Sequence, residues 1–252
     1  MTIALPARAK LNLNLEVVKS RVDGYHDIRT TIQAVDLHDL IEITPTHAQT
    51  SLETSGLAVV NTEDNSVLTA HRAVEQATQR KLPTHFHLHK RIPPGSGLGG
   101  ASSDAATTLK GLVATYKLDI DLTAIAQTLG ADVPFFLQGG KAVAEGRGEL
   151  LKPLPTEPAW FAIAWPRIEL STADVYRAWD EVHGEGPNHL RRAAEHVEKH
   201  LQEFAAVLGS QWQMTGSGSA FFLPCETEAQ ANERAAKLDS WTAVTYAVGP
   251  WT

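Results

Sequence analysis

Four glycines stand within six residues of the segment Pro93-Pro94-Gly95-Ser96-Gly97-Leu98-Gly99-Gly100-Ala101-Ser102-Ser103-Asp104. Glycine adopts positive φ angles and lets backbone N–H groups approach an anion closely. The helix predicted to open at Ser102 adds unpaired N–H donors and a partial positive charge. A flexible surface turn needs only one or two glycines, so this segment predicts a loop that binds phosphate.

Two other types of phosphate loop fit the segment less well. A Walker A loop is excluded because no Lys-Ser or Lys-Thr pair follows the glycines. Gly95, Gly97 and Gly100 match the dinucleotide pattern G-x-G-x-x-G, and Asp119 lies at a suitable distance beyond them. The loop does not follow a first strand, however, and the residues before Asp119 make a poor parallel strand. A dinucleotide dehydrogenase therefore stays an alternative that a lone motif supports only weakly.

The patterns around the loop place it between a strand and a helix. Residues 85–92 alternate like a half-buried strand, and an Ala-rich helix follows Ser102. Residues 9–17 alternate in the same way, and Asp23-Gly24 is typical of a tight turn. The other elements predicted before residue 150 are a strand pair over 30–43 that breaks near Leu37-His38-Asp39, a helix from Ser66, and a helix over 122–129 that ends at Gly130.

Three prolines, Pro153, Pro155 and Pro158, fall within six residues, a density that no helix or central strand continues. We therefore predict a domain boundary there, with an ATP-binding domain over 1–152 and a smaller α+β domain over 153–252. The second domain is predicted to hold a strand over 159–164, a helix from Ser171 to Val182, one helix over 189–208, two strands flanking Gly216-Ser217-Gly218, a helix over 226–237 and a strand over 241–247.

Composition narrows the class of protein. The 252 residues include 22 Lys plus Arg and 29 Asp plus Glu, a net charge of −7, which disfavours binding to nucleic acid or to an anionic membrane. The single Cys225 excludes an internal disulfide and a four-cysteine zinc site. Without a long apolar run or a signal-like start, we expect a cytoplasmic protein with no membrane contact.

No metal-ligating residue is predicted. His85, His87 and His89 share one strand face about 7 Å apart, without a carboxylate in the same run, so an exposed strand face explains them better.

The glycine loop and three further groups of motifs, taken together, resemble the GHMP family of small-metabolite kinases, which includes homoserine, mevalonate and galactose kinases. The further motifs are Ala7–Leu15 with Asp23-Gly24-Tyr25-His26, Gly130–Phe136 with Gly146–Glu149, and Met214–Ser219. The Asp-Gly-Tyr-His segment is similar to that of the branch that phosphorylates 4-diphosphocytidyl-2-C-methyl-D-erythritol in the non-mevalonate isoprenoid route.

The resemblance implies a two-domain α+β fold, with a first domain like a ribosomal-protein fold and a ferredoxin-like second domain. It implies ATP and Mg²⁺ as cofactors, and transfer of the γ-phosphate to the 2-hydroxyl of the cytidine diphosphate methylerythritol substrate. The small molecule is the expected partner, and the expected oligomeric state is a monomer or weak homodimer.

The same resemblance assigns roles to individual residues. Asp132 would accept the proton of the acceptor hydroxyl, and Lys10 would keep that Asp ionised and stabilise developing charge. Asn65 and Lys90 would lie near the adenine. The rest of the predicted ATP site is Pro94, Gly95, Gly97, Leu98, Gly99, Gly100, Ser102 and Ser103. The residues predicted to bind the cytidyl substrate are Asn12, Tyr25, His26 and Thr172.

Some positions depart from the family pattern. Arg8 stands where Pro is common, Ala101 replaces a frequent glycine, and Asn188-His189-Leu190-Arg191 replaces the usual Asn-Asp-Leu-Glu. His183 is the nearest candidate for a second aromatic partner of the cytosine.

Two alternatives to this function remain open from the sequence. A related kinase could act on another small alcohol, although Tyr25-His26 argues against it. A non-catalytic RNA-binding module is a different class, which the net charge of −7 and the Lys10/Asp132 pair oppose.

Overall fold

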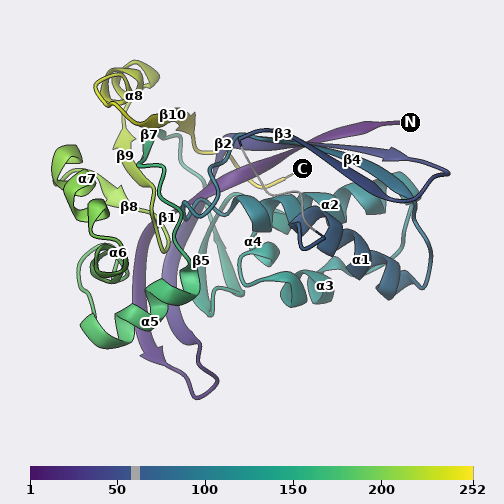
Figure 1. Ribbon diagram of the computed structural model, residues 1–252, viewed down its shortest axis with the longest axis horizontal. Coiled ribbons are helices and arrows are strands. Elements are labelled where there is room, and N and C mark those ends of the chain that lie inside the picture. Colours follow the sequence, from purple (N-terminus) through teal and green to yellow (C-terminus); the bar gives the residue numbers. More distant parts are fainter. Residues whose placement is uncertain (58–62, 252) are drawn as a thin grey trace. The chain divides into compact units, whose positions relative to one another are not determined.

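The computed structural model describes residues 1–57 and 63–251 (Figure 1). Its strands are β1 (Ile3–Ser20), β2 (His26–Pro45), β3 (Ser51–Gly56), β4 (Thr84–Lys90), β5 (Lys141–Gly146), β6 (Leu150–Leu154), β7 (Trp160–Trp165), β8 (Gln213–Met214), β9 (Phe221–Cys225) and β10 (Trp241–Tyr246). Its helices are α1 (Ser66–Thr78), α2 (Gly100–Tyr116), α3 (Leu122–Leu129), α4 (Val133–Gln138), α5 (Thr172–Val182), α6 (Arg191–Val197), α7 (His200–Leu208) and α8 (Glu228–Ala235). The predicted α+β class is confirmed.

The strands form two sheets. In the first, the pairing order is β3-β4-β2-β5-β6, and β1 also pairs with β2. β3 runs parallel to β4, whereas β2 is antiparallel to both β4 and β5. The second sheet has the order β10-β7-β9-β8, and each of these pairs is antiparallel.

The chain divides into two compact units that do not follow a single cut in the sequence. Unit 1 contains Met1–Ala9, His38–Ile92 and Gly99–Gln138, and unit 2 contains Lys10–Leu37, Pro93–Leu98 and Gly139–Thr252. The predicted boundary at 152/153 falls inside β6, which pairs with β5 at the edge of its sheet, where proline is tolerated. The division into domains 1–152 and 153–252 stays a prediction.

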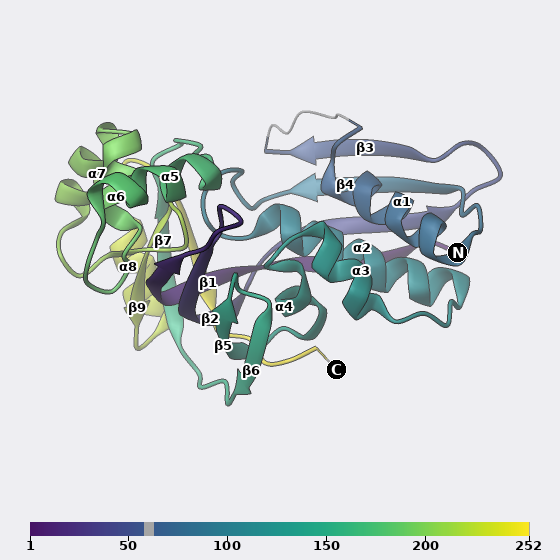
Figure 2. The same ribbon diagram turned by 90° about the horizontal axis from the view of Figure 1, so that it is seen from below.

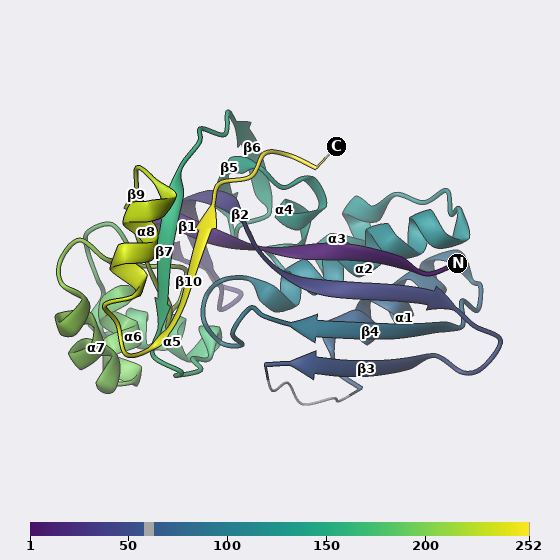
Figure 3. The same ribbon diagram turned by 90° about the horizontal axis from the view of Figure 1, so that it is seen from above.

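Unit 1 is a sheet with helices on one face. Figure 2 shows α1, α2 and α3 on the near side of the sheet, and Figure 3 shows the strands from the opposite side. Phe86 and Leu88 of β4, with Ile41 and Ile43 of β2, are almost completely buried. Because the helices cover this face, β4 and α2 hold the two ends of the glycine loop on a rigid support.

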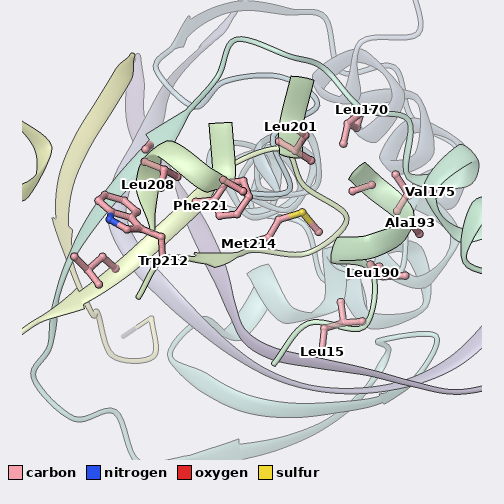
Figure 4. Close-up of a cluster of buried hydrophobic side chains, with 14 of the residues drawn as sticks. Leu15, Leu170, Val175, Leu190, Ala193, Leu201, Leu208, Trp212, Met214 and Phe221 are labelled. Carbon is pink, nitrogen blue, oxygen red and sulfur yellow. The ribbon is translucent and has the colours of Figure 1, made fainter. Parts of the chain in front are cut away.

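Unit 2 contains the second sheet and the helices that pack on it. Its hydrophobic core combines residues from β1, α5, α7, β8 and β9, among them Leu15, Val175, Leu201, Met214 and Phe221 (Figure 4). α8 packs against β7, β9 and β10. None of the helices in the described part of the chain is long and apolar enough to cross a bilayer.

Most predicted elements are confirmed, and two are wrong. β2 continues through Asp39 without a break, because that carboxylate is fully buried and paired with Lys90 instead of facing solvent in a turn. The single helix predicted over 189–208 is two helices, α6 and α7. Glu198 between them is extended, with φ −136° and ψ 103°, and its carboxylate accepts a hydrogen bond from the N–H of His200.

Candidate active site

The predicted glycine loop connects β4 to α2. Gly95, Gly97 and Gly99 have φ angles of 57°, 77° and 76°, in the left-handed region that favours glycine. α2 begins at Gly100 with Gly99 as its N-cap, so the predicted helix start at Ser102 is wrong by two residues. The N–H of Ser103 donates to the carbonyl oxygen of Gly99 at 2.9 Å. The N–H groups of the preceding helical residues have no acceptor within the helix, which suits them to an anion.

Backbone hydrogen bonds within unit 2 fix the first half of this loop. They join it to β1, to the segment before α5, and to Ala220, which directly follows the third glycine motif, Met214–Ser219. The bonds run from Lys10 N to Leu98 O (3.0 Å), from Leu170 N to Gly95 O (3.1 Å), and from Ala220 N to Ser96 O (2.9 Å). The loop therefore has a defined conformation before any ligand binds.

Gly97 lies directly against the third glycine motif. A Cβ atom on Gly97 would come within 3.0 Å of the carbonyl oxygen of Gly218 and closer still to that of Thr215. The two glycine-rich segments thus pack backbone to backbone, which no larger residue at position 97 allows. Such a cradle of closely packed backbone is the expected geometry of a phosphate site.

Lys10 of β1 is buried, and its ammonium donates a short hydrogen bond to Oδ1 of Asn12. Asn12 in turn donates from Nδ2 to the hydroxyl of Thr30 at 2.8 Å, and its backbone N–H donates to the hydroxyl of Thr215 at 2.9 Å. A Cβ atom on Gly216 would lie 3.1 Å from the Lys10 ammonium. Lys10 therefore points at the third glycine motif, held there by Asn12.

Lys90 ends β4 in unit 1, and its ammonium lies between two carboxylates. It donates a short hydrogen bond to Asp39 and one of 2.7 Å to Oδ2 of Asp104. Burial opposes the charged ammonium, but attraction to Asp104 and Asp39 outweighs that effect and holds the pKa of Lys90 above its ordinary value. The Lys90 ammonium therefore belongs to a buried ion cluster with Asp39 and Asp104.

Asn65 and Asp132 both precede helices of unit 1. Asn65 is the N-cap of α1, and its Oδ1 accepts from the N–H of Val67 at 3.0 Å. Asp132 directly precedes α4, and its carbonyl oxygen accepts from the N–H of Phe136 at 3.4 Å. Asp132 is one predicted catalytic residue, and it belongs to unit 1. Lys10, the other predicted catalytic residue, belongs to unit 2.

Tyr25 and His26, at the β1–β2 turn, differ sharply in exposure. The Tyr25 side chain is 55% exposed, and the Arg147 guanidinium carbon lies 4.9 Å from the centre of its ring. His26 is buried, with its ring stacked on Tyr176 at 5.0 Å and Nε2 at 2.8 Å from Oδ1 of Asp180. The hydrogen bond with His26 lowers the pKa of Asp180, so this carboxylate stays ionised and keeps the imidazole in place.

Comparisons with known proteins assign the family. Residues 65–140 match the model of the GHMP kinases N terminal domain. A 4-diphosphocytidyl-2-C-methyl-D-erythritol kinase of Chromohalobacter salexigens is 34% identical, covering 96% of this chain and 89% of that protein. The kinase of the same name from Halorhodospira halophila is 37% identical, covering 90% of this chain and 86% of that protein.

The chain belongs to the 4-diphosphocytidyl-2-C-methyl-D-erythritol kinase family. A crystal structure of 4-(cytidine 5'-diphospho)-2C-methyl-D-erythritol kinase has a TM-score of 0.84 at 34% identity, covering 98% of this chain and all of that one. A homoserine kinase structure at 14% identity has a TM-score of 0.66, which shows a shared fold. The predicted GHMP kinase fold is confirmed.

Several residues predicted for the kinase site gather in unit 2 around the third glycine motif. Lys10 and Asn12 reach it from β1, and Gly97 reaches it from the phosphate loop. Thr172, at the start of α5, joins it through a hydrogen bond of 2.9 Å between its hydroxyl and that of Ser217. The hydrogen bond between Asn12 and Thr215 joins residues 203 positions apart in the chain, which no local pattern could have shown.

The departing segment Asn188-His189-Leu190-Arg191 lies in unit 2 near α6, whereas Arg8 and Ala101 belong to unit 1. Asn188 has a structural part, since its Nδ2 donates to the carbonyl oxygens of Met214 and Gly216 at 2.8 and 2.9 Å. His183 packs edge-on against Trp179 with ring centres 4.7 Å apart. Both line a cleft of about 560 Å³ that also includes Arg191 and Trp212.

Sequence reasoning missed four residues that support the predicted kinase site: Asp39 and Asp104 around Lys90, Asp180 beside His26, and Arg147 over Tyr25. One signal was available for Asp39, because a charged residue inside a run of β-type residues indicates either a turn or a buried ion pair. The pairing of His26 with Asp180, 154 residues later, left no local signal.

The phosphate loop fits the triphosphate of ATP, because positive φ angles let its backbone approach an anion and the first N–H groups of α2 have no acceptor within the helix. In the part of the chain that the structure describes, no group of three His, Cys, Asp or Glu could hold a metal ion.

Proposed function

We propose that this protein transfers the γ-phosphate of ATP, as its magnesium complex, to the 2-hydroxyl of 4-diphosphocytidyl-2-C-methyl-D-erythritol. The observation that carries the proposal is the glycine loop, whose three positive-φ glycines lead directly into the uncapped start of α2. Phosphoryl transfer asks the protein chiefly to position the phosphates and neutralise their charge, and this loop suits both tasks. The names of relatives that are 34–37% identical over nearly the whole chain supply the acceptor.

Lys10 is the cation we assign to the transferring phosphate. Its bond to Asn12 orients the ammonium toward the third glycine motif. The assignment rests on this position and on the match of Ala7–Leu15 to the family motif. A cation held beside the transferring phosphate would stabilise the charge that develops on the phosphate oxygens.

Asp132 is the residue we assign to accept the proton of the acceptor hydroxyl. An ionised carboxylate beside the hydroxyl makes the oxygen a better nucleophile as the bond to phosphorus forms. The assignment rests on the match of Gly130–Phe136 to the family motif.

Tyr25 and His26 are assigned to the cytosine. The exposed Tyr25 ring offers a flat face for stacking, and Arg147 supports the ring. The ionised Asp180 favours the His26 tautomer with a proton on Nε2, which leaves Nδ1 as an acceptor for a donor on the base edge.

The test is a phosphoryl-transfer assay with the cytidyl substrate, comparing the parent with Asp132→Asn and Lys10→Met. We expect each variant to lose about 100-fold or more in kcat, in line with the contribution of a general base or an electrostatic stabiliser, while the fold is retained. Asp119→Asn, which removes an exposed carboxylate of unit 1, and Lys19→Met, which removes an exposed lysine of β1, are matched controls. Unchanged kcat in Asp132→Asn would overturn the assignment of the base.

A panel of other small alcohols tests the acceptor. A parent enzyme that phosphorylates another alcohol with a higher kcat/KM than the cytidyl compound would contradict the proposed substrate.

A further inference from the structure

Three charged side chains are buried together in unit 1. Asp39 is 0% exposed, Asp104 is 2% exposed and Lys90 is 6% exposed. Buried charges are costly unless they are paired and hydrogen-bonded. Here the Lys90 ammonium bonds to Oδ2 of both carboxylates, whereas Oδ1 of Asp104 has no hydrogen-bond partner among the described residues.

The three residues stand at the two ends of the phosphate loop. Lys90 is the last residue of β4, and Asp104 lies in the second turn of α2, so the whole loop falls between them. Asp39 lies on β2, one residue before Leu40, which pairs with His89. One ion cluster therefore ties the strand before the loop to the helix after it.

Asp39 also holds the first backbone groups of the loop. Its Oδ1 accepts from the N–H of Arg91 at 2.5 Å and from the N–H of Ile92 at 2.8 Å, while its Oδ2 accepts from Lys90. A single carboxylate thus fixes three consecutive residues. An asparagine could not do the same, because its amide NH₂ would face either the ammonium or the two N–H donors.

The first residue of α2 lies against this cluster. A Cβ atom on Gly100 would come 3.0 Å from Cγ2 of Ile92 and 3.4 Å from the ammonium of Lys90. A shift of Lys90 or Ile92 would therefore reach the helix start whose N–H groups face the phosphates. Errors of about 1 Å in such positions can cost about 100-fold in rate.

We propose that Asp39 and Asp104 are positioning residues for ATP, which act by clamping Lys90 and so setting the two ends of the phosphate loop. This inference rests on the proposed function, since it names residues that serve the same ATP site. It gives Lys90 an indirect part in ATP binding, through the clamp and not through contact of its ammonium with the nucleotide.

The experiment measures the Kd for ATP by equilibrium dialysis without the acceptor, and the KM values for ATP and for the cytidyl substrate. We expect Asp39→Asn and Asp104→Ala to weaken ATP binding about tenfold and to raise the KM for ATP similarly. The KM for the cytidyl substrate should stay within about twofold of the parent value. Asp104→Asn keeps an oxygen that accepts from Lys90, so it should recover most of the affinity that Asp104→Ala loses.

Thr108→Val is the matched control. Thr108 is fully buried one turn further along α2, and its hydroxyl donates to the backbone carbonyl of Asp104 at 2.8 Å. This variant should lower the melting temperature, as a merely structural change does, and leave the affinity for ATP unaltered.

A double variant separates the clamp from direct contact. If Lys90 acts through the clamp, Lys90→Met combined with Asp104→Ala should weaken ATP binding no more than the stronger single change. Additive losses, or an unchanged Kd in both Asp39→Asn and Asp104→Ala, would overturn the proposal. If Asp39→Asn fails to fold, the two Asp104 variants and the double variant decide.

The proposed function can fail separately. A parent that binds ATP but does not phosphorylate the cytidyl substrate would refute the assigned reaction, while the dialysis results would still decide whether the clamp exists.

Discussion

Replacing Gly97 with alanine adds one methyl group to the phosphate loop at a position surrounded by backbone. The new Cβ would lie 3.0 Å from the Gly218 carbonyl oxygen, and nearer to that of Thr215. Ordinary contacts of a Cβ atom begin at 3.4 Å, so relief of the Gly218 contact alone needs a shift of 3.4 − 3.0 = 0.4 Å. The neighbours are main-chain atoms, which cannot rotate away as a flexible side chain could.

Two costs follow from this substitution. Gly97 has φ +77°, and an L residue in the left-handed region costs about 1–2 kcal/mol. The second cost is displacement of the loop, which moves the N–H groups that we assign to the ATP phosphates. Because a misplacement of about 1 Å can cost about 100-fold, a shift of 0.4 Å or more should lower kcat/KM for ATP about tenfold, or about 1.4 kcal/mol.

Gly209→Ala separates the two costs. Gly209 has φ +84°, but a Cβ atom there would meet nothing within 4 Å. Its ψ of 171° lies outside the left-handed region, in a conformation that only glycine adopts readily, so this variant should lose at least as much conformational energy without moving the loop. Thermal denaturation measures the shared loss of stability, and steady-state kinetics at varied ATP measures the effect on the loop.

The expected pattern is a fall in the melting temperature for both variants, with a fall in kcat/KM for ATP only in Gly97→Ala. Equal kinetic constants in the two variants would refute the reasoning, because they would mean that the contact with Thr215 and Gly218 does not set the position of the loop.

Two further predictions concern the cytosine end and the buried ion cluster. Tyr25→Ala should raise the KM for the cytidyl substrate about tenfold and leave the KM for ATP and the melting temperature unchanged, because the exposed ring serves stacking worth about 1–3 kcal/mol; Tyr25→Phe should behave like the parent, and an unaltered KM in Tyr25→Ala would contradict the assignment. Burial raises the pKa of Asp104 above its ordinary value of 3.8, so the folded protein retains this proton to a higher pH than the unfolded chain does, and stability should fall as the pH rises from about 4. Asp104→Asn, which does not titrate, should show a flatter profile of melting temperature against pH, and a parent profile no steeper than the variant's would count against this pKa.

The phosphate loop and its flanking elements could be predicted because they depend on local properties. A cluster of glycines permits positive φ angles wherever it occurs, and the turn at Asp23-Gly24 and the N-cap at Ser171 rest on contacts within a few residues. Ser171 does accept from the N–H of Asp174, as expected. The extended Glu198 was not predictable, because it interrupts an apolar helical pattern without a glycine or proline to mark the break.

The motifs also indicated which residues to predict for the site, but not what those residues contact. Asn12 was predicted to bind the substrate, yet its side chain holds Lys10 and bonds to Thr30. Lys90 was predicted to lie near the adenine, yet its ammonium bonds to Asp39, 51 residues away, and to Asp104. Their parts in binding ligands stay predictions.

The sequence by itself determined where the chain can cradle a phosphate, since steric freedom at glycine and the N–H groups of a helix start are properties of a short segment. Only the tertiary structure decided which charged residues are buried and which partners they have. A single Asp or Lys in a sequence is expected to be exposed to solvent. Its burial becomes favourable only when another element, distant in the sequence, brings the opposite charge to it. Asp39, Lys90 and Asp104 are such a set, assembled by β2, β4 and α2.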